Sequence, residues 1–342
     1  MNTTGAQNQF FQYIKEILPP NISLVEEIAC ELNISNDSAY RRIRGEKPIA
    51  MEEIRKLCAK YKISLDKLLH LDSDSVIFSG KRAAHENFDF ESYLQDFLRQ
   101  HQIINSFTEK ELLILPKDIP VYHYYNFPIL AAFKYFFWMK TVLHYPEYHK
   151  SLFDPNNMIG SLLETGEKIL ATYNNIPSTE IWNVENINTT LRQIEYYQET
   201  NVFSCEEDIY DIYDSLEKSI DFVEMQAELG FKVNQPGKGT RQGASFNLYI
   251  NDFVLGDNTY LPILDGKKVV FLTHTHLNYI STTDESFAEY TYKHFQNILQ
   301  KSTLISVVGE KDRRRFFNRI RANITDRKNQ IQRNVVPSYK TI

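Results

Sequence analysis

The stretch from Ser23 to Leu69 constrains the fold more than any other part of the chain, because its apolar residues and helix-boundary residues alternate at short intervals. Ser23 and Glu26 form an S-x-x-E pattern, which is typical of a capping box at the start of a helix. Apolar residues at i, i+3, i+4 and i+7 then give one buried stripe, formed by Val25, Ile28, Ala29 and Leu32.

A sharp turn is expected directly after this first stripe. Asn33 is one of the few residues other than glycine that tolerates a left-handed backbone, and Ile34 follows as an apolar residue at the corner. Ser35 is a good N-cap for a next helix, which is expected to run to about Arg44 and to end at Gly45. Two helices separated by so short a turn have the spacing of a helix-turn-helix motif.

Helical patterns also flank this pair. Upstream, an apolar stripe at residues 10–18 is stopped by two consecutive prolines at 19 and 20. Downstream, residues 52–61 predict a helix with acidic residues in its first turn, and Ser64 is expected to cap a last short helix at residues 65–69. The sequence therefore predicts a small all-α unit at the N-terminus.

Residues 8 to 70 resemble the DNA-binding domain of the lambda-repressor/Cro type, often called XRE. The matching features are Ala29 on the first helix of the pair, the turn at Asn33 and Ile34, the RxRG ending at residues 42–45, and the closing ISLDKLL at residues 63–69. Two positions depart from the family pattern, which usually has glycine where this chain has Asn33 and often has glutamate where it has Ile43.

The resemblance implies that the second helix of the pair lies in the major groove of DNA. Carried over residue by residue, it assigns base reading to Asn36, Asp37 and Arg41. Asparagine pairs well with adenine, arginine with guanine, and aspartate accepts only from cytosine. Phosphate contacts, which set the register without reading sequence, are assigned to Ser23, Ser35, Tyr40, Arg44 and Lys47.

Two alternatives for this unit stay open from the residues alone. The arginines at 41, 42 and 44 also suit the C-terminus of a helix, where the dipole favours cations. Three-helix units of this shape serve as protein-docking modules as well. The agreement of the caps, the turn and the arginine cluster in order and spacing favours DNA binding.

The charge is divided unevenly along the chain. The formal net charge is −6, yet residues 1–72 are neutral, residues 73–310 carry −14 and residues 311–342 carry +8. Within the first segment, residues 35–62 carry +4, so a favourable potential for phosphate lies at the expected docking face. The acidic middle is unsuited to lying on DNA, and the basic helix expected at 310–324 is predicted to pair with it.

Composition and cysteine usage predict a cytoplasmic protein with no membrane span. No secretory signal pattern begins the chain, and the most apolar stretch, residues 129–145, contains Lys134 and Lys140. The three cysteines, Cys30, Cys58 and Cys205, are not clustered, so reduced and buried thiols are expected rather than disulfides or a metal site.

The length of 342 residues suggests two or three domains. We expect a multidomain protein with an all-α helix-turn-helix domain at 1–72, a linker at 73–87, a mainly helical region at 88–230 and an α+β domain at 231–342. Strand-like alternation and the Asp265-Gly266 hairpin signal predict an antiparallel sheet in the last of these.

Three further features are weaker indications of chemistry. The aromatic run at residues 122–138 is expected to form core, with a ligand pocket or a dimer interface as alternatives. Gly237, Gly239 and Gly243 do not match the spacing of a phosphate loop. His274 and His276 point to one side of a strand, yet no third metal ligand lies nearby, so neither a metal nor a cofactor is expected.

The sequence thus predicts a sequence-specific transcriptional regulator rather than an enzyme. Useful specificity normally needs two such modules, so a homodimer on a dyad-symmetric operator is expected, with the C-terminal part providing dimerisation or response to a small-molecule or protein effector. Two alternatives remain: an enzyme targeted by the N-terminal domain, and an antitoxin-like adaptor that uses this domain to bind protein.

Overall fold

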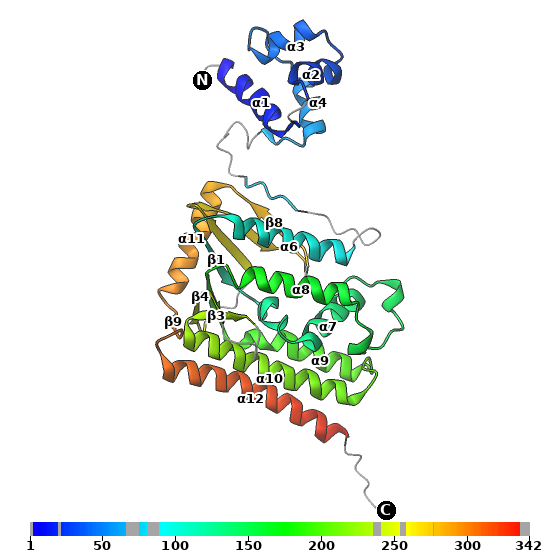
Figure 1. Ribbon diagram of the computed structural model, residues 1–342, viewed down its shortest axis with the longest axis vertical. Coiled ribbons are helices and arrows are strands. Elements are labelled where there is room, and N and C mark those ends of the chain that lie inside the picture. The colour runs from blue at the N-terminus through cyan, green and yellow to red at the C-terminus, as the bar shows by residue number, and fades with distance from the viewer. Residues whose placement is uncertain are drawn as a thin grey trace, which may run out of the picture. The chain divides into compact units, whose positions relative to one another are not determined.

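The computed structural model describes residues 3–19, 22–65, 75–80, 89–234, 241–253, 258–275 and 277–335. The chain divides into two compact units, Met1–Ile77 and Phe78–Ile342 (Figure 1). The division falls inside the segment that the sequence predicts as a linker, residues 73–87.

In the N-terminal unit, the regular secondary structure of the described residues is entirely helical. Its helices are α1 (Thr3–Ile17), α2 (Leu24–Leu32), α3 (Asn36–Ile43) and α4 (Met51–Tyr61). Their apolar stripes meet in one small core, which contains Phe10, Phe11, Ile14, Ile28, Ala29, Leu32, Ala39, Leu57 and Ile63. The last helix expected from the sequence, at residues 65–69, lies almost entirely outside the described residues.

The turn between α2 and α3 has the local chemistry that the sequence predicts. Asn33 ends α2 in the left-handed conformation, with φ 54° and ψ 51°. Ser35 caps α3 by accepting a hydrogen bond from the backbone N–H of Ser38 at 3.3 Å. The capping box expected at Ser23 and Glu26 is wrong, because the Ser23 side chain makes no cap hydrogen bond.

The C-terminal unit is built on one mixed sheet (Figure 1). Among the described residues it has nine strands, in the order β3-β4-β2-β1-β5-β7-β8, with β6 on β5 and β9 on β4. The strands are β1 (Lys110–Leu115), β2 (Ser178–Trp182), β3 (Phe231–Asn234), β4 (Arg241–Ile250), β5 (Thr259–Leu264), β6 (Lys267–Lys268), β7 (Val270–Thr273), β8 (Tyr279–Thr282) and β9 (Thr303–Leu304).

This sheet corrects the predicted fold class in two ways. It is not purely antiparallel, since β1 pairs in parallel with β2, and β2 in parallel with β4. The stretch 88–230 is also not a separate helical region, because its strands β1 and β2 pair with β5 and β4 of the following stretch. All five residues of β2 are buried, and so are the last four of β1. A strand buried on both faces lacks the apolar–polar alternation by which strands are recognised.

Helices cover both faces of the sheet. One face packs against α11 (Glu285–Leu299) through Leu113, Ile181 and Leu261. The opposite face carries Leu112, Trp182 and Phe246 and packs against the remaining helices. These are α6 (Phe90–Ser106), α7 (Pro128–Phe137), α8 (Gly160–Tyr173), α9 (Asn188–Glu199), α10 (Glu206–Leu229) and α12 (Glu310–Val335). Short helical turns are η1 (Val121–Tyr124), η2 (Trp138–Val142), η3 (Pro146–Tyr148), η4 (Pro155–Asn157) and η5 (Val184–Ile187).

The basic helix α12 lies alongside α10 and pairs with acidic residues, as the sequence predicts (Figure 1). Arg321 contacts both Asp221, at 2.7 Å, and Glu224. Arg327 pairs with Glu195, and Lys328 with Asp214. The apolar side of the helix, Phe316, Ile320 and Ile324, is buried in the main core.

The aromatic run at residues 122–138 lies mostly in the core, as expected. Tyr122, Tyr124, Phe133, Tyr135 and Phe136 are each at most 3% exposed. The Asp265-Gly266 turn also forms between β5 and β6, with φ 45° and 81° at its two residues. Positive φ at both positions fits a two-residue hairpin turn whose twist matches that of the flanking strands.

Candidate nucleic-acid interface

Every residue assigned to DNA from the sequence is exposed on the surface of the N-terminal unit. Asn36 and Asp37 occupy the first turn of α3, and Tyr40 and Arg41 follow one turn later on the same helix. Such residues, three or four apart, share one face of a helix. The other face of α3 points into the core, where Ala39 is 0% exposed. The surface formed by Asn36, Asp37, Tyr40 and Arg41 is called the α3 face below.

Arg42 has a structural role that its neighbours do not share. It is 6% exposed. Its guanidinium makes a bidentate contact with the Glu53 carboxylate, from Nε to Oε2 at 2.9 Å and from Nη2 to Oε1 at 2.8 Å. Its Nη1 donates to the backbone oxygen of Ser38 at 3.0 Å and to the Ser38 hydroxyl at 2.9 Å. Paired contacts of this kind fix orientation as well as distance, so Arg42 holds α3 against the start of α4.

Glu53 serves two partners at once. Besides Arg42, its carboxylate accepts a hydrogen bond from the backbone N–H of Ala50 at 3.0 Å, at the N-terminus of α4. Burial tends to raise the pKa of the Glu53 carboxyl, but the hydrogen bonds from Arg42 and Ala50 outweigh it and hold the pKa below its usual value. Glu53 is therefore ionised at neutral pH, and the pair carries a full charge on each side.

Gln7 supports the loop that follows α3, and sequence reasoning missed it. Its amide nitrogen donates to the backbone oxygens of Arg42, at 2.7 Å, and Lys47, at 2.8 Å. Its amide oxygen accepts from the N–H of Ile49 at 3.1 Å. The backbone beside Lys47 is thus held by α1. No sequence motif marks Gln7, because its partners are backbone atoms 35 to 42 residues away.

The exposed cations of this surface differ in how they are held. Arg44 lies 3.3 Å from the Glu46 carboxylate, and its guanidinium stands 5.5 Å from the centre of the Tyr40 ring. The Arg41 guanidinium has no hydrogen bond or ion pair with any residue that the structure describes. Within the described residues, Arg41 is thus the arginine of the 41–44 cluster whose guanidinium has no protein partner.

The remaining assigned residues have simple local environments. Asp37 lies in the first turn of α3, where the helix dipole stabilises a carboxylate. The Ser35 oxygen accepts the cap bond from Ser38, and its O–H remains able to donate to a phosphate. Ser23 precedes α2 with its hydroxyl unused by the helix, and Lys47 is exposed in the loop after α3.

The described residues show no site built around the histidine pair or the glycines considered from the sequence. His274 is exposed at the end of β7, whereas His276, Gly237 and Gly239 lie outside the described residues. Gly243 is a strand residue in β4, where an added Cβ would meet the Asn174 backbone oxygen at 2.6 Å, so close packing explains it. Among the described residues, no three potential metal ligands cluster.

The structure corrects the expectation for the cysteines. Cys30, Cys58 and Cys205 are free, but the prediction of buried thiols is wrong for Cys30 and Cys205, which are exposed.

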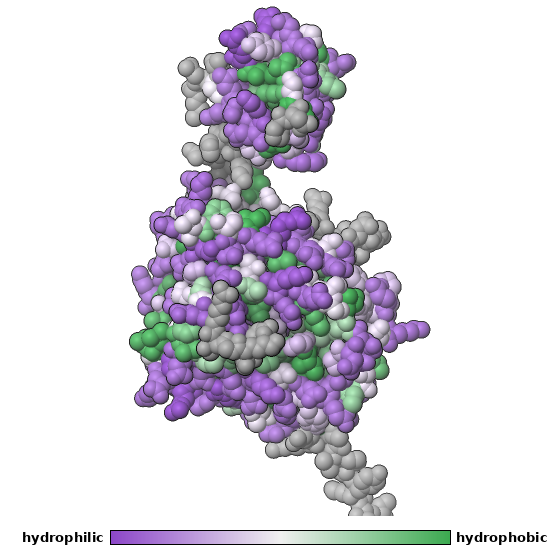
Figure 2. All heavy atoms as spheres, in the orientation of Figure 1, coloured by the Kyte–Doolittle hydropathy of each residue, from purple (hydrophilic) through white to green (hydrophobic). Residues whose placement is uncertain are grey.

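In the part of the chain that the structure describes, no helix combines the length and the apolar character needed to cross a bilayer. On the face shown in Figure 2, the N-terminal unit is mostly hydrophilic, with smaller hydrophobic areas between.

Comparison with protein-family models, with curated proteins and with solved structures gave no match to this chain.

Proposed function

We propose that this protein is a sequence-specific DNA-binding transcriptional regulator of the lambda-repressor/Cro type. The α3 face enters the major groove, where Asn36, Asp37 and Arg41 contact base edges. Ser23, Ser35, Tyr40, Arg44 and Lys47 contact phosphates around it. The protein binds as a homodimer to a dyad-symmetric operator whose half-sites are about 34 Å apart, one turn of the DNA helix.

The observation that carries this proposal is the contrast between two neighbouring arginines. Arg42 is buried and fully used by Glu53 and Ser38, whereas Arg41 is exposed and unused within the described residues. An arginine presented on a rigidly docked helix suits bidentate contact with guanine, because the entropy lost on binding is limited to its own side chain. If all three arginines only stabilised the C-terminus of the helix, this difference between Arg41 and Arg42 would have no explanation.

Selection of bound duplexes from a random pool tests the proposal. The full-length protein is expected to enrich a short sequence with dyad symmetry, and its affinity is expected to fall steeply between 50 and 200 mM salt because phosphate contacts release counterions. Enrichment of nothing at low salt contradicts the proposal. Binding to a protein partner with little salt dependence, in the absence of DNA binding, would instead support the adaptor alternative.

A further inference from the structure

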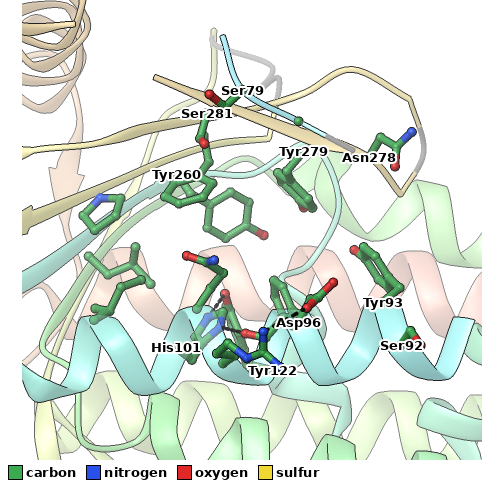
Figure 3. Close-up of a pocket in the computed structure, with 18 of the residues that line it drawn as sticks. Ser79, Ser92, Tyr93, Asp96, His101, Tyr122, Tyr260, Asn278, Tyr279 and Ser281 are labelled. Atoms are coloured by element: carbon green, nitrogen blue, oxygen red, sulfur yellow. Dashed lines mark hydrogen bonds and ion pairs between the residues drawn. The ribbon is translucent and has the colours of Figure 1, made fainter. Parts of the chain in front are cut away.

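The C-terminal unit contains a cavity of about 690 Å³ between α6 and the strands β5, β7 and β8. Figure 3 shows side chains entering this space from both sides, with Tyr93, Asp96 and His101 on the helix and Tyr260 and Tyr279 on the strands. The volume lies in the range of pockets that hold small organic ligands. Every lining residue belongs to this unit, from Ser79 to Ser281.

The wall of the cavity is mainly aromatic. Tyr93, Phe97 and Tyr122 form a row of nearly parallel rings, with angles of 13° and 10° between successive planes. Across the cavity, the rings of Tyr260 and Tyr279 meet edge to face at 5.5 Å. Flat surfaces of this kind favour a ligand that is itself a flat ring, because stacked and edge-to-face contacts add to the burial of apolar area.

At the floor of the cavity, both ring nitrogens of His101 already have hydrogen-bond partners. His101 contacts the Phe97 backbone oxygen through Nδ1 at 2.7 Å and the Tyr122 hydroxyl through Nε2 at 2.8 Å. A carbonyl oxygen only accepts, so Nδ1 carries the proton and the Tyr122 O–H donates to Nε2. Burial lowers the pKa of His101 to about 4, so the ring is uncharged at neutral pH.

The charges around the cavity are unsuited to an anion. Asp89 and Asp96 line it, together with a single arginine, Arg99. The Arg99 side chain is 71% exposed and lies 3.8 Å from the Asp96 carboxylate. With His101 neutral, the lining carries more negative than positive charge. A ligand carboxylate or phosphate would therefore find no unshared cation among these lining residues.

Asn278 provides a polar side chain that the described residues of the fold leave without a partner. It lines the cavity and is 9% exposed. Its backbone N–H donates to the Thr275 hydroxyl at 3.3 Å, and its backbone oxygen accepts from the N–H of His274 at 2.8 Å. Its side-chain amide has no hydrogen-bond partner in the described part of the chain. An amide that lines a cavity and has no protein partner keeps both its N–H donors and its carbonyl acceptor available to a ligand.

We propose that this cavity binds a small, flat, uncharged heteroaromatic molecule that carries a hydrogen-bond donor next to an acceptor, and that Asn278 recognises that edge. The asparagine amide presents an N–H donor beside a carbonyl acceptor, so it pairs with such an edge through two hydrogen bonds. The aromatic rings cover the faces of the ligand. This inference goes beyond the proposed DNA binding and does not depend on it.

The test uses 2-quinolinone as the probe, because its ring N–H and carbonyl are adjacent and it is uncharged. Isothermal titration of the full-length protein is expected to give a dissociation constant below about 1 mM. N-methyl-2-quinolinone, which lacks the donor, is expected to bind about fivefold more weakly, in line with the net value of one hydrogen bond. Quinoline-2-carboxylate, an anion of similar shape, is expected to bind at least tenfold more weakly.

Two substitutions on α6 locate the binding site. Gln100 and Gln102 are both exposed on this helix, but only Gln100 is among the lining residues. Gln100→Trp places a large side chain at the cavity and is expected to weaken 2-quinolinone binding at least tenfold. The matched control Gln102→Trp is expected to leave it unchanged. Equal binding by both variants contradicts the assigned location.

Asn278→Leu tests the chemistry of recognition. It removes the donor and the acceptor with little change in volume, so both quinolinones are expected to bind this variant equally. A thermal unfolding curve like that of the wild type would show that the variant folds. The proposal is overturned if 2-quinolinone does not bind the wild type, if the anion binds as tightly, or if Asn278→Leu keeps the preference for the N–H compound.

The two proposals fail separately. An Arg41→Ala protein with weakened operator binding is still expected to bind 2-quinolinone as the wild type does, because Arg41 lies in the other unit. A protein that rejects every ring compound yet selects a symmetric operator would remove the cavity proposal alone.

Discussion

At the scale of single residues, side chains of the same type have different roles because of what they contact. Arg41 and Arg42 share a side-chain type, but Arg42 is 6% exposed and bonded to Glu53, while Arg41 is exposed. His101 and His274 differ in the same way, since one is buried against Tyr122 and the other is exposed at the end of β7. Residue type alone does not separate these roles.

Arg41→Ala is expected to weaken binding to the best operator by about 1–3 kcal/mol and to relax base preference at one position. Lys47→Ala, the matched comparison, is expected to weaken binding to all sequences alike, because a phosphate contact carries no base information. Competition binding with single-base operator variants measures both effects. Unchanged preference in the Arg41→Ala protein would show that another residue reads that base.

His101 is expected to make stability depend on pH. Its pKa is about 4 in the folded protein against 6.5 for the ordinary side chain, because it is buried. Between these values the unfolded chain binds a proton that the folded chain does not, so the free energy of unfolding falls as the pH drops below 6.5. At pH 5 the loss is about 2 kcal/mol, from about 1.4 kcal/mol per pH unit.

Urea unfolding at pH 7 and pH 5, followed by tryptophan fluorescence, measures this loss. Both tryptophans of the chain, Trp138 and Trp182, lie in the C-terminal unit, so the signal reports that unit. His101→Gln keeps an acceptor for Tyr122 and is expected to reduce the difference between the two pH values by about 2 kcal/mol. His149→Gln, at an exposed position, is expected to keep the difference.

At the scale of elements, helix ends and turns follow local sequence, whereas the docking of one element on another does not. The left-handed Asn33 and the Ser35 cap are effects within four residues of the turn, and the sequence predicts both. The contacts that position α3 come from Glu53 and Gln7, 11 and 35 residues from Arg42. Nothing in the local pattern indicates these partners.

Glu53→Gln is expected to loosen α3 without unfolding the rest of the protein. It leaves the Arg42 charge without its carboxylate, at a cost of about 2–4 kcal/mol. The value is below that of a fully buried pair because the Glu53 side chain keeps 18% exposure. Hydrogen exchange of peptides covering α3 and α4 measures the change. Glu52→Gln, at a pair exposed by about 75%, is expected to change exchange little.

At the scale of the whole molecule, the sheet joins stretches that look unrelated in sequence. β1 lies between β2, about 70 residues later, and β5, about 150 residues later. This pairing places α6 opposite β5, β7 and β8 and so creates the cavity lined by Tyr93, Tyr260 and Asn278. The aromatic run at residues 122–138, for which a ligand pocket is an alternative to core, contributes only Tyr122 to the lining of this cavity.

The proposed mode of DNA binding requires two copies of the chain. Light scattering after size-exclusion chromatography is expected to give about twice the chain mass of 40.2 kDa at micromolar concentration. The expectation follows from energetics, since one module contacts too few bases for useful specificity. A monomer that stays monomeric when the selected operator is added would contradict the homodimer while leaving DNA contact by a single α3 face intact.

The sequence by itself determined the features that depend on a few adjacent residues: the helices of the N-terminal unit, the turn at Asn33, the hairpin at Asp265-Gly266 and the amphipathic helix α12. Tertiary structure alone decided the parallel pairing of β1 with β2, the burial of Arg42 and the position of Asn278 at a cavity. The reason is physical: caps, turns and periodicity act over one or two turns of chain. Strand pairing and burial instead depend on contacts between residues far apart in sequence, which no local pattern encodes.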